Sequence, residues 1–242
     1  MWTNPLKRRK FKNVTVYDPF REVDPAKVSD LNEWMEKASP RDAVALAICN
    51  ARRKFFEDLH DQSRWLTGDQ IVKNAFKDRV NTGRNNSDKA FKKMLVDYVK
   101  GVAPVLGKPW KICRYLYLPY CVPNSHWFAV EIDLEKRRIH IFDSLTSMVR
   151  EAKLGNYMKP LKVVVPRLMK KYVNENYSTS MFTHHRVKKL PVQDNGSDCG
   201  LFTVKFIEFS LASLDLNFVQ PKHMLMWRQK MAAEIFAGEF DP

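Results

Sequence analysis

The residues Gln193-Asp194-Asn195-Gly196-Ser197-Asp198-Cys199-Gly200 form a polar stretch with two glycines, and an apolar run from Leu201 to Leu214 follows directly. This pattern predicts a turn and then a helix that begins at Cys199. The first N–H groups of a helix have no partner inside the helix, and its N-terminus carries a partial positive charge. A cysteine at this position is therefore well placed to act as a thiolate.

The predicted helix from Cys199 to Leu214 is apolar nearly all round, and its few polar residues include Lys205 and Glu208. Helices of this kind are buried, so we expect this one to run through the core beside a sheet and to hold Cys199 rigidly. The alternative for Cys199 is a small packed core residue. A nucleophile is favoured only if the chain also supplies partners for the sulfur.

The length and composition favour one ordered domain. The chain has 242 residues, of which 45% are hydrophobic and 28% are charged. We expect a basic arm at residues 1–20 and a single domain at residues 21–242. Within this domain we expect a helical lobe at about 24–100 and a core with the sheet at about 110–236.

The charge and the cysteines limit the cellular setting. The net charge of +14 favours acidic proteins, nucleic acid or anionic membranes as partners. The run Lys7-Arg8-Arg9-Lys10 is typical of a nuclear import signal and equally of a solvated terminus. The four cysteines lack close-paired spacing, and neither a signal peptide nor a membrane span of ~18 apolar residues is evident. We therefore expect an intracellular, reducing, nuclear or nucleocytoplasmic setting without a membrane partner.

Helical patterns dominate the first hundred residues. Asp24-Pro25 predicts an N-cap and a first helical turn, and Ser39-Pro40 predicts a second helix that reaches about Leu59. Further helical patterns carry Ile71 to Phe76 and Phe91 to Tyr98, with a polar loop at residues 84–88.

Short β-branched and aromatic runs follow Gly101 and predict strands. The expected strands are Ile112–Leu118, Trp127–Ile132, Arg138–Phe142 and about His185–Val192, and the expected later helices are a region interrupted by Pro160 and Pro166, Cys199–Leu214 and Pro221–Phe236. The sequence thus predicts an α+β fold, in which a helical N-terminal part accompanies a central mixed sheet flanked by helices.

The hairpin of Trp127–Ile132 and Arg138–Phe142 carries His126 and Asp143 at its open end. If its turn is centred directly after Leu134, these two residues face each other, whereas a register different by one residue would separate them. Asp143 can then accept a hydrogen bond from one ring nitrogen and favour the imidazolium form. The other ring nitrogen is left to serve a thiol.

Cysteine, histidine and an acid together form the general arrangement for acyl transfer through a thioester. The tetrahedral intermediate also needs hydrogen-bond donors at its oxyanion. Gln193 lies six residues before Cys199 and can donate its side-chain amide, together with the backbone N–H of Cys199. The alternatives are a structural role for His126 and a role for Asp143 as a strand-ending turn residue.

Three blocks of the sequence carry a resemblance to a known family. His126-Trp127, Phe142-Asp143-Ser144-Leu145 and Gln193 to Gly200 resemble the active-site blocks of the ubiquitin-like-protein-specific cysteine proteases, the SUMO protease family. Trp65-Leu66, with Asp69 and Ile71, also resembles the first block of that family.

The resemblance implies a role for each of these residues and a papain-like or adenovirus-protease-like α+β fold. His126 would be the general base, Asp143 its orienting residue, Gln193 an oxyanion donor and Cys199 the nucleophile. Trp65 and Trp127 would flank a narrow channel for the Gly-Gly tail of the modifier, because only glycine lets a backbone pass between two indole faces. The alternative for both tryptophans is core packing.

The function implied by the resemblance is that of a cysteine isopeptidase or endopeptidase. It would cleave after the C-terminal Gly-Gly of a ubiquitin-like modifier, with SUMO as the favoured modifier, as a monomer and without a cofactor. Three alternatives stay open: a protease for a different ubiquitin-like modifier, an acetyltransferase that uses the same Cys-His-acid site, and a non-catalytic module that binds the modifier.

Metal and nucleic-acid sites are not favoured by the sequence. His184-His185 with Cys199 or Cys121 matches no zinc spacing, so no metal site is predicted. The basic pairs lack the signature of a basic-aromatic module, so nucleic acid is a secondary candidate partner only.

Overall fold

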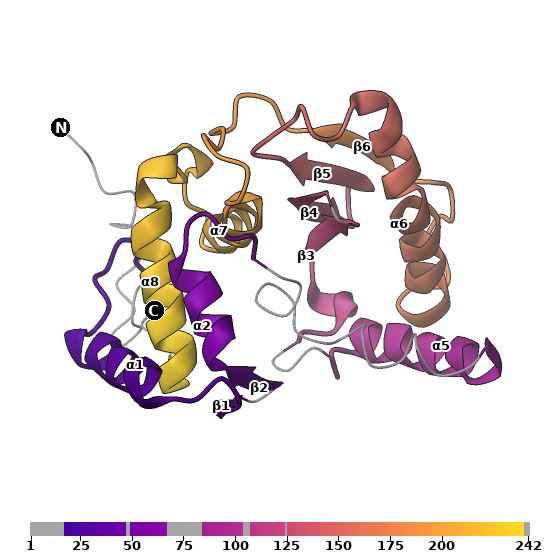
Figure 1. Ribbon diagram of the computed structural model, residues 1–242. Helices are drawn as coiled ribbons and strands as arrows, with labels where there is room; N and C mark the ends of the chain where they lie inside the picture. Colours follow the sequence, from indigo (N-terminus) through magenta and orange to yellow (C-terminus); the bar gives the residue numbers. More distant parts are fainter. Residues whose placement is uncertain (1–16, 47–48, 67–83, 104–106, 124, 240–242) are drawn as a thin grey trace, which may run out of the picture.

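A four-stranded sheet stands at the centre of the computed structural model, which describes residues 17–46, 49–66, 84–103, 107–123 and 125–239 (Figure 1). The strand order is β3-β4-β5-β6. Strands β3, β4 and β5 pair antiparallel, and β6 pairs parallel with β5, so the sheet is mixed, as predicted. The strands are β3 (Tyr115–Val122), β4 (His126–Asp133), β5 (Arg138–Phe142) and β6 (Thr183–Arg186).

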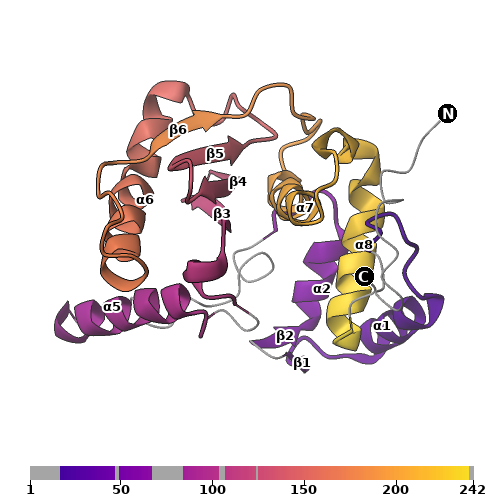
Figure 2. The ribbon, with the colours of Figure 1, turned by 180° about the vertical axis from the view of Figure 1, so that it is seen from behind.

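Helices cover both faces of this sheet (Figures 1 and 2). Helix α6 (Glu151–Tyr172) lies on one face and helix α7 (Cys199–Leu211) on the other. Side chains alternate along a strand, so Phe128 and Val130 join the core on the α6 side, whereas Ala129 joins the core on the α7 side. All of β4 except Glu131 is buried.

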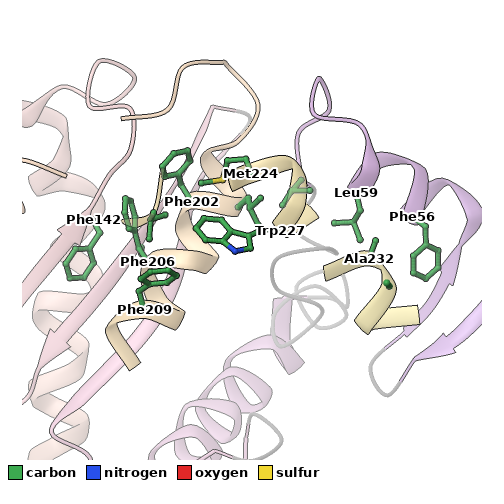
Figure 3. Packing of buried hydrophobic residues seen from close by; sticks show 14 of the residues in the cluster. Phe56, Leu59, Phe142, Phe202, Phe206, Phe209, Met224, Trp227 and Ala232 are labelled. Carbon is green, nitrogen blue, oxygen red and sulfur yellow. The ribbon is translucent and has the colours of Figure 1, made fainter. Parts of the chain in front are cut away.

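Helix α7 lies between the sheet and the C-terminal helix α8 (Met224–Ala237), as Figure 3 shows. The ring centroids of Phe206 and Phe142 are 6.3 Å apart, and those of Phe209 and Trp227 are 5.8 Å apart. The prediction of a buried helix that begins at Cys199 is confirmed. The helix ends at Leu211, and Ser213 follows it in a left-handed conformation.

The two ends of the described chain pack together. Helices α1 (Pro25–Lys37) and α2 (Arg53–His60) lie against α8. The Asp24 side chain accepts a hydrogen bond from the backbone N–H of Ala26 at 2.9 Å, which confirms the predicted N-cap. Nε1 of Trp227 donates to the carbonyl oxygen of Pro19 at 2.7 Å, and Phe20 packs against the same indole.

The predicted helix from residue 40 to Leu59 is wrong in its first half. A hairpin of β1 (Ala43–Leu46) and β2 (Cys49–Arg52) precedes α2. Val44 and Leu46, two residues apart, pack against the core, while Ala43 and Ala45 are exposed. The apolar pattern therefore has the period of a strand, which the small alanines between these residues obscure.

Two further predictions about helices are also corrected. Helix α5 (Arg84–Lys100) includes residues 84–88, which were expected to form a loop, and this polar run contains no glycine or proline to stop a helix. Helix α6 continues through Pro160 and Pro166, because five buried residues along it offset the backbone hydrogen bonds that proline removes. The predicted helix at residues 71–76 lies outside the described residues.

The remaining boundaries differ from the expectations by a few residues. Strand β3 starts after a 3₁₀ turn at Trp110–Ile112. Strand β6 begins at Thr183, before the predicted start at His185, and ends at Arg186 rather than at Val192. Short 3₁₀ turns at Leu216–Phe218 and Pro221–His223 precede α8. In the part of the chain that the structure describes, no helix combines the length and the apolarity needed to cross a membrane.

Replacing Phe206 with alanine tests the role of α7 in the core. Phe206 is fully buried, so we expect Phe206→Ala to lose about 3–5 kcal/mol of unfolding free energy in urea titrations. Leu211, at the end of the same helix, is 64% exposed, and Leu211→Ala should stay within about 0.5 kcal/mol of the wild type. Similar losses in both variants would contradict the central place of α7.

Candidate active site

His126 and Asp143 meet at the open end of the β4–β5 hairpin. His126 is the first residue of β4, and Asp143 directly follows β5. His126 Nε2 lies 2.7 Å from Asp143 Oδ1, and both side chains are buried. The predicted contact between the imidazole and the carboxylate is therefore present.

The register of this hairpin differs by two residues from the predicted one. Ala129 pairs with Phe142, so Asp143 lies level with Phe128 rather than with His126. The four-residue turn after Asp133 causes the difference, because Asp133 Oδ1 accepts from the backbone N–H groups of the second and third turn residues at 3.0 and 2.8 Å. A shift of two residues keeps both side chains on one face, so the contact survives.

Two groups orient the Asp143 carboxylate besides His126. The backbone N–H of Leu145 donates to Oδ1 at 2.9 Å, and Arg186 Nη2 lies 3.3 Å from Oδ2. Arg186 is the last residue of β6 and also donates to the carbonyl oxygen of Val149 at 2.6 Å. Arg186 was not among the predicted site residues, because its place beside Asp143 depends on the parallel pairing of β6 with β5.

Cys199 is the first residue of α7 and is almost fully buried. Cys199 interacts with the His126 side chain and contributes to the raised pKa of the imidazole. Burial of His126 works against the charged imidazole, but the hydrogen bonds and negative charges of Asp143 and Cys199 outweigh it and raise the pKa of His126 to about 9. The imidazolium is therefore favoured beside the sulfur.

Gln193 connects the end of β5 to the loop that leads into Cys199. Its backbone N–H donates to the carbonyl oxygen of Ser144 at 3.0 Å, and Ser144 Oγ donates to Gln193 Oε1 at 2.7 Å. Gln193 Nε2 donates to the carbonyl oxygen of Asn195 at 2.6 Å. The donor end of the amide thus lies toward the Cys199 loop, and one of its two N–H groups is used in this bond.

Asn195 organises the loop of residues 194–198. Its Oδ1 accepts from the backbone N–H groups of Ser197 and Asp198, both at 3.0 Å, and its Nδ2 donates to Asp198 Oδ2 at 2.8 Å. The predicted polar turn therefore has a defined geometry, with Asn195 as its centre. Asn195 was not among the predicted site residues.

The two tryptophans named in the sequence analysis have different environments. Trp65 is 39% exposed and donates from Nε1 to the carbonyl oxygen of Gly196 at 2.7 Å. Trp127 is 7% exposed and pairs with Cys121 across β3 and β4. Burial and the charge of Cys199 raise the pKa of Cys121. The channel between the two rings stays a prediction.

The candidate metal residues have other contacts. His184 Nδ1 lies 3.4 Å from Lys162 Nζ, and the His185 ring packs on His140 with centroids 4.6 Å apart. Among the described residues, no group of three or more His, Cys, Asp or Glu side chains is arranged to hold a metal.

The raised pKa of His126 predicts a pH dependence of stability. The folded state binds the proton more tightly than the unfolded chain, so this contribution is complete below pH 6.5 and is lost as the pH rises through about 9. Between pH 6.5 and 9.5, urea titrations should show a fall in unfolding free energy that is about 2 kcal/mol larger for the wild type than for His126→Gln. Asp143→Asn should show a smaller fall in unfolding free energy than the wild type. If His126→Gln shows the same fall as the wild type, groups other than His126 cause the effect.

Comparison with known proteins matches most of the chain to one family. The model of the Ulp1 protease family, C-terminal catalytic domain, matches residues 41–239. The Caenorhabditis elegans sentrin-specific protease is 28% identical over 208 residues, which are 80% of this chain and 28% of that protein. The Arabidopsis thaliana ubiquitin-like-specific protease 1A is 31% identical over 137 residues, which are 54% of this chain and 24% of that protein. The chain thus spans about a quarter of the length of these relatives.

Solved structures of low sequence identity share the fold. The C-terminal Ulp1 protease domain in complex with Smt3, the yeast ortholog of SUMO, matches with a TM-score of 0.65 and 18% identity over 90% of this chain and 96% of that chain. The Chaetomium thermophilum Ulp1-like SUMO protease catalytic domain matches with a TM-score of 0.63 and 19% identity over 95% and 97%. These likenesses confirm the predicted α+β cysteine protease fold. Because the family model covers most of the chain, this protein belongs to the Ulp1 protease family and carries its C-terminal catalytic domain.

Proposed function

We propose that this chain is a cysteine protease that cleaves after the C-terminal Gly-Gly of a ubiquitin-like modifier, with SUMO as the modifier. It would act on conjugates as an isopeptidase and on precursors as an endopeptidase. The observation that carries the proposal is the buried contact set of Asp143, His126 and Cys199, with 2.7 Å between the carboxylate and the imidazole. Membership of the Ulp1 protease family supports the same chemistry.

In the first half of the reaction, the Cys199 sulfur attacks the carbonyl carbon of the terminal glycine. The oxyanion that forms accepts hydrogen bonds from the backbone N–H of Cys199, which has no acceptor within α7, and from the side-chain amide of Gln193. His126 then gives its proton to the leaving amine as the C–N bond breaks. The modifier remains on Cys199 as a thioester.

In the second half, water replaces the amine. Neutral His126 takes a proton from the water, whose oxygen attacks the thioester carbonyl, and the C–S bond breaks to release the carboxylate of the modifier. Asp143 holds one ring nitrogen throughout and compensates the positive charge of the imidazolium. Arg186 Nη2 lies 3.3 Å from the other oxygen of Asp143 and compensates its negative charge.

The choice of SUMO rests on the relatives and on charge. The related proteins are named sentrin-specific protease or ubiquitin-like-specific protease. The net charge of +14 favours an acidic partner, because opposite charges speed and orient the encounter. The exposed ring of Trp65 beside Gly196 suits a narrow entrance that only a glycine tail can thread.

An electrophilic probe tests the proposed chemistry and the modifier together. We expect SUMO with an electrophile in place of its C-terminal carboxylate to form a covalent adduct with the wild type and none with Cys199→Ala, as seen by intact-protein mass spectrometry. Cys113→Ala serves as the matched control and should be labelled like the wild type, because the Cys113 sulfur donates to the carbonyl oxygens of Lys108 and Pro109 rather than to a histidine.

A panel of probes separates the alternatives. An adduct with another ubiquitin-like modifier and not with SUMO would overturn the modifier assignment while keeping the protease. Labelling of Cys199→Ala at the wild-type rate would overturn the nucleophile. Binding of SUMO without an adduct or cleavage would support a non-catalytic module.

Trp65 is the better test of the channel, because Trp127 is buried and its loss would also destabilise the core. We expect Trp65→Ala to lower kcat/KM for a SUMO precursor by roughly 100-fold, because a misaligned tail leaves the scissile carbonyl out of position. Trp65→Phe keeps an aromatic wall and loses only the bond to Gly196, so a smaller decrease is expected. Unchanged kcat/KM in Trp65→Ala would exclude a role for this ring.

A further inference from the structure

Arg228 is a fully buried cation outside the catalytic set. It lies in α8, and its Nε and Nη2 donate to Asp198 Oδ1 at 2.9 and 2.6 Å. Asp198 is the residue before Cys199 and the N-cap of α7, and its other oxygen accepts from Asn195. Arg228 thus binds the residue that directly precedes the nucleophile.

The remaining donors of Arg228 reach a different part of the chain. Nη1 lies 3.3 to 3.4 Å from the carbonyl oxygens of Asp58, Leu59 and Asp61. The carbonyls of the last turn of a helix have no partner within the helix, so this cation stabilises the C-terminal end of α2. Nη2 also donates at 3.1 Å to the carbonyl oxygen of Arg64, the residue before Trp65.

The two segments held by Arg228 are also bonded directly to each other. Trp65 Nε1 donates to the carbonyl oxygen of Gly196 at 2.7 Å, and Ser197 Oγ donates to the carbonyl oxygen of Gln62. Hydrogen bonds therefore join two segments into one unit. One is the segment of residues 61–65, which ends with the exposed indole of Trp65, and the other is the loop of residues 194–198, which directly precedes Cys199. Arg228 is the group that contacts both segments from the core side.

We propose that Arg228 is a positioning residue that fixes the Trp65 wall relative to the Cys199 loop and so sets the rate of acylation. This inference rests on the proposed protease function. Guanidinium supplies five donors in a planar fork, which suits one carboxylate and several carbonyls at once. An ammonium group has three donors on one atom and cannot reach both segments with the same geometry.

The expected kinetic signature separates positioning from mere stability. Binding of the folded part of a modifier does not depend on the relation of Trp65 to Cys199, whereas attack on the tail does. Loss of the fork should therefore lower kcat and leave KM nearly unchanged. A purely structural role would reduce the folded fraction without changing kcat per folded molecule.

The experiment compares Arg228→Lys and Arg228→Met with a matched control, Lys230→Met. Lys230 is also a buried cation of α8, but it donates to the carbonyl oxygen of Arg21, away from both segments. With a SUMO precursor, we expect kcat per folded molecule to fall roughly 30-fold in Arg228→Lys and KM to change less than about threefold. Lys230→Met should keep the wild-type kcat. If Arg228→Met does not fold, Arg228→Lys, which retains the charge, carries the test.

Two measurements that need no modifier accompany the kinetics. The rate at which iodoacetamide alkylates Cys199 in Arg228→Lys should stay within about threefold of the wild type, since the cation beside Asp198 is retained. Amide hydrogen exchange of residues 61–66 and of residues 193–200 should increase together in Arg228→Lys and in neither segment of Lys230→Met.

The outcomes are distinct for the two proposals. A wild-type protein that does not process SUMO would overturn the proposed function, whereas exchange in the two segments would still test their connection through Arg228. Unchanged exchange in Arg228→Lys, or faster exchange with wild-type kcat, would overturn the positioning role. Faster amide hydrogen exchange in both segments of Arg228→Lys, together with a lower kcat, supports the positioning role.

Discussion

The burial of α7 between the sheet and α8 is the constraint on which the rest of the structure depends. Phe202, Phe206 and Phe209 lie in the core and pack toward both neighbours. Close packing leaves such a helix little freedom to translate or rotate. Because Cys199 is its first residue, the position of the sulfur is determined by aromatic rings further along the same helix. The hairpin end with His126 and Asp143 is fixed by the sheet that this helix covers.

Charge compensation around the sulfur follows a simple pattern. Each buried acid close to Cys199 has its own arginine: Arg186 lies beside Asp143, and Arg228 lies beside Asp198. An uncompensated carboxylate in such a place would carry a large desolvation cost and would disfavour a neighbouring thiolate. The two arginines come from different elements, so the electrostatics of the site depends on both the sheet and the terminal helix.

Local patterns in the sequence predicted the elements that carry the chemistry. The start of α7, the β4–β5 hairpin and the Asp24 cap all depend on residues close in the chain, and all three are present. The hairpin register was two residues off because the Asp133 side chain, rather than strand pattern alone, decides the turn. The β1–β2 hairpin was taken for a helix because alanine fits either period.

The contacts that the sequence could not predict are the long-range ones. Arg228 contacts Asp198 and the segment before Trp65, and neither partner is within reach of a periodicity argument. The sequence pattern of α8 gives no indication of the carbonyls that surround Arg228, and Lys230 in the same helix has other partners. The same holds for Arg186, whose role depends on the parallel pairing of β6 with β5.

The packing of Pro19 and Phe20 on Trp227 shows that the folded core includes residues outside the match to the family model. The family model starts at residue 41, yet Pro19, Phe20 and α1 pack on the core around α8. Sequence similarity and folding unit therefore have different boundaries. Core positions demand apolar volume rather than particular groups, so many sequences can fill this space. The N-terminal segment therefore belongs to the packed core, although the match to the family model begins after it.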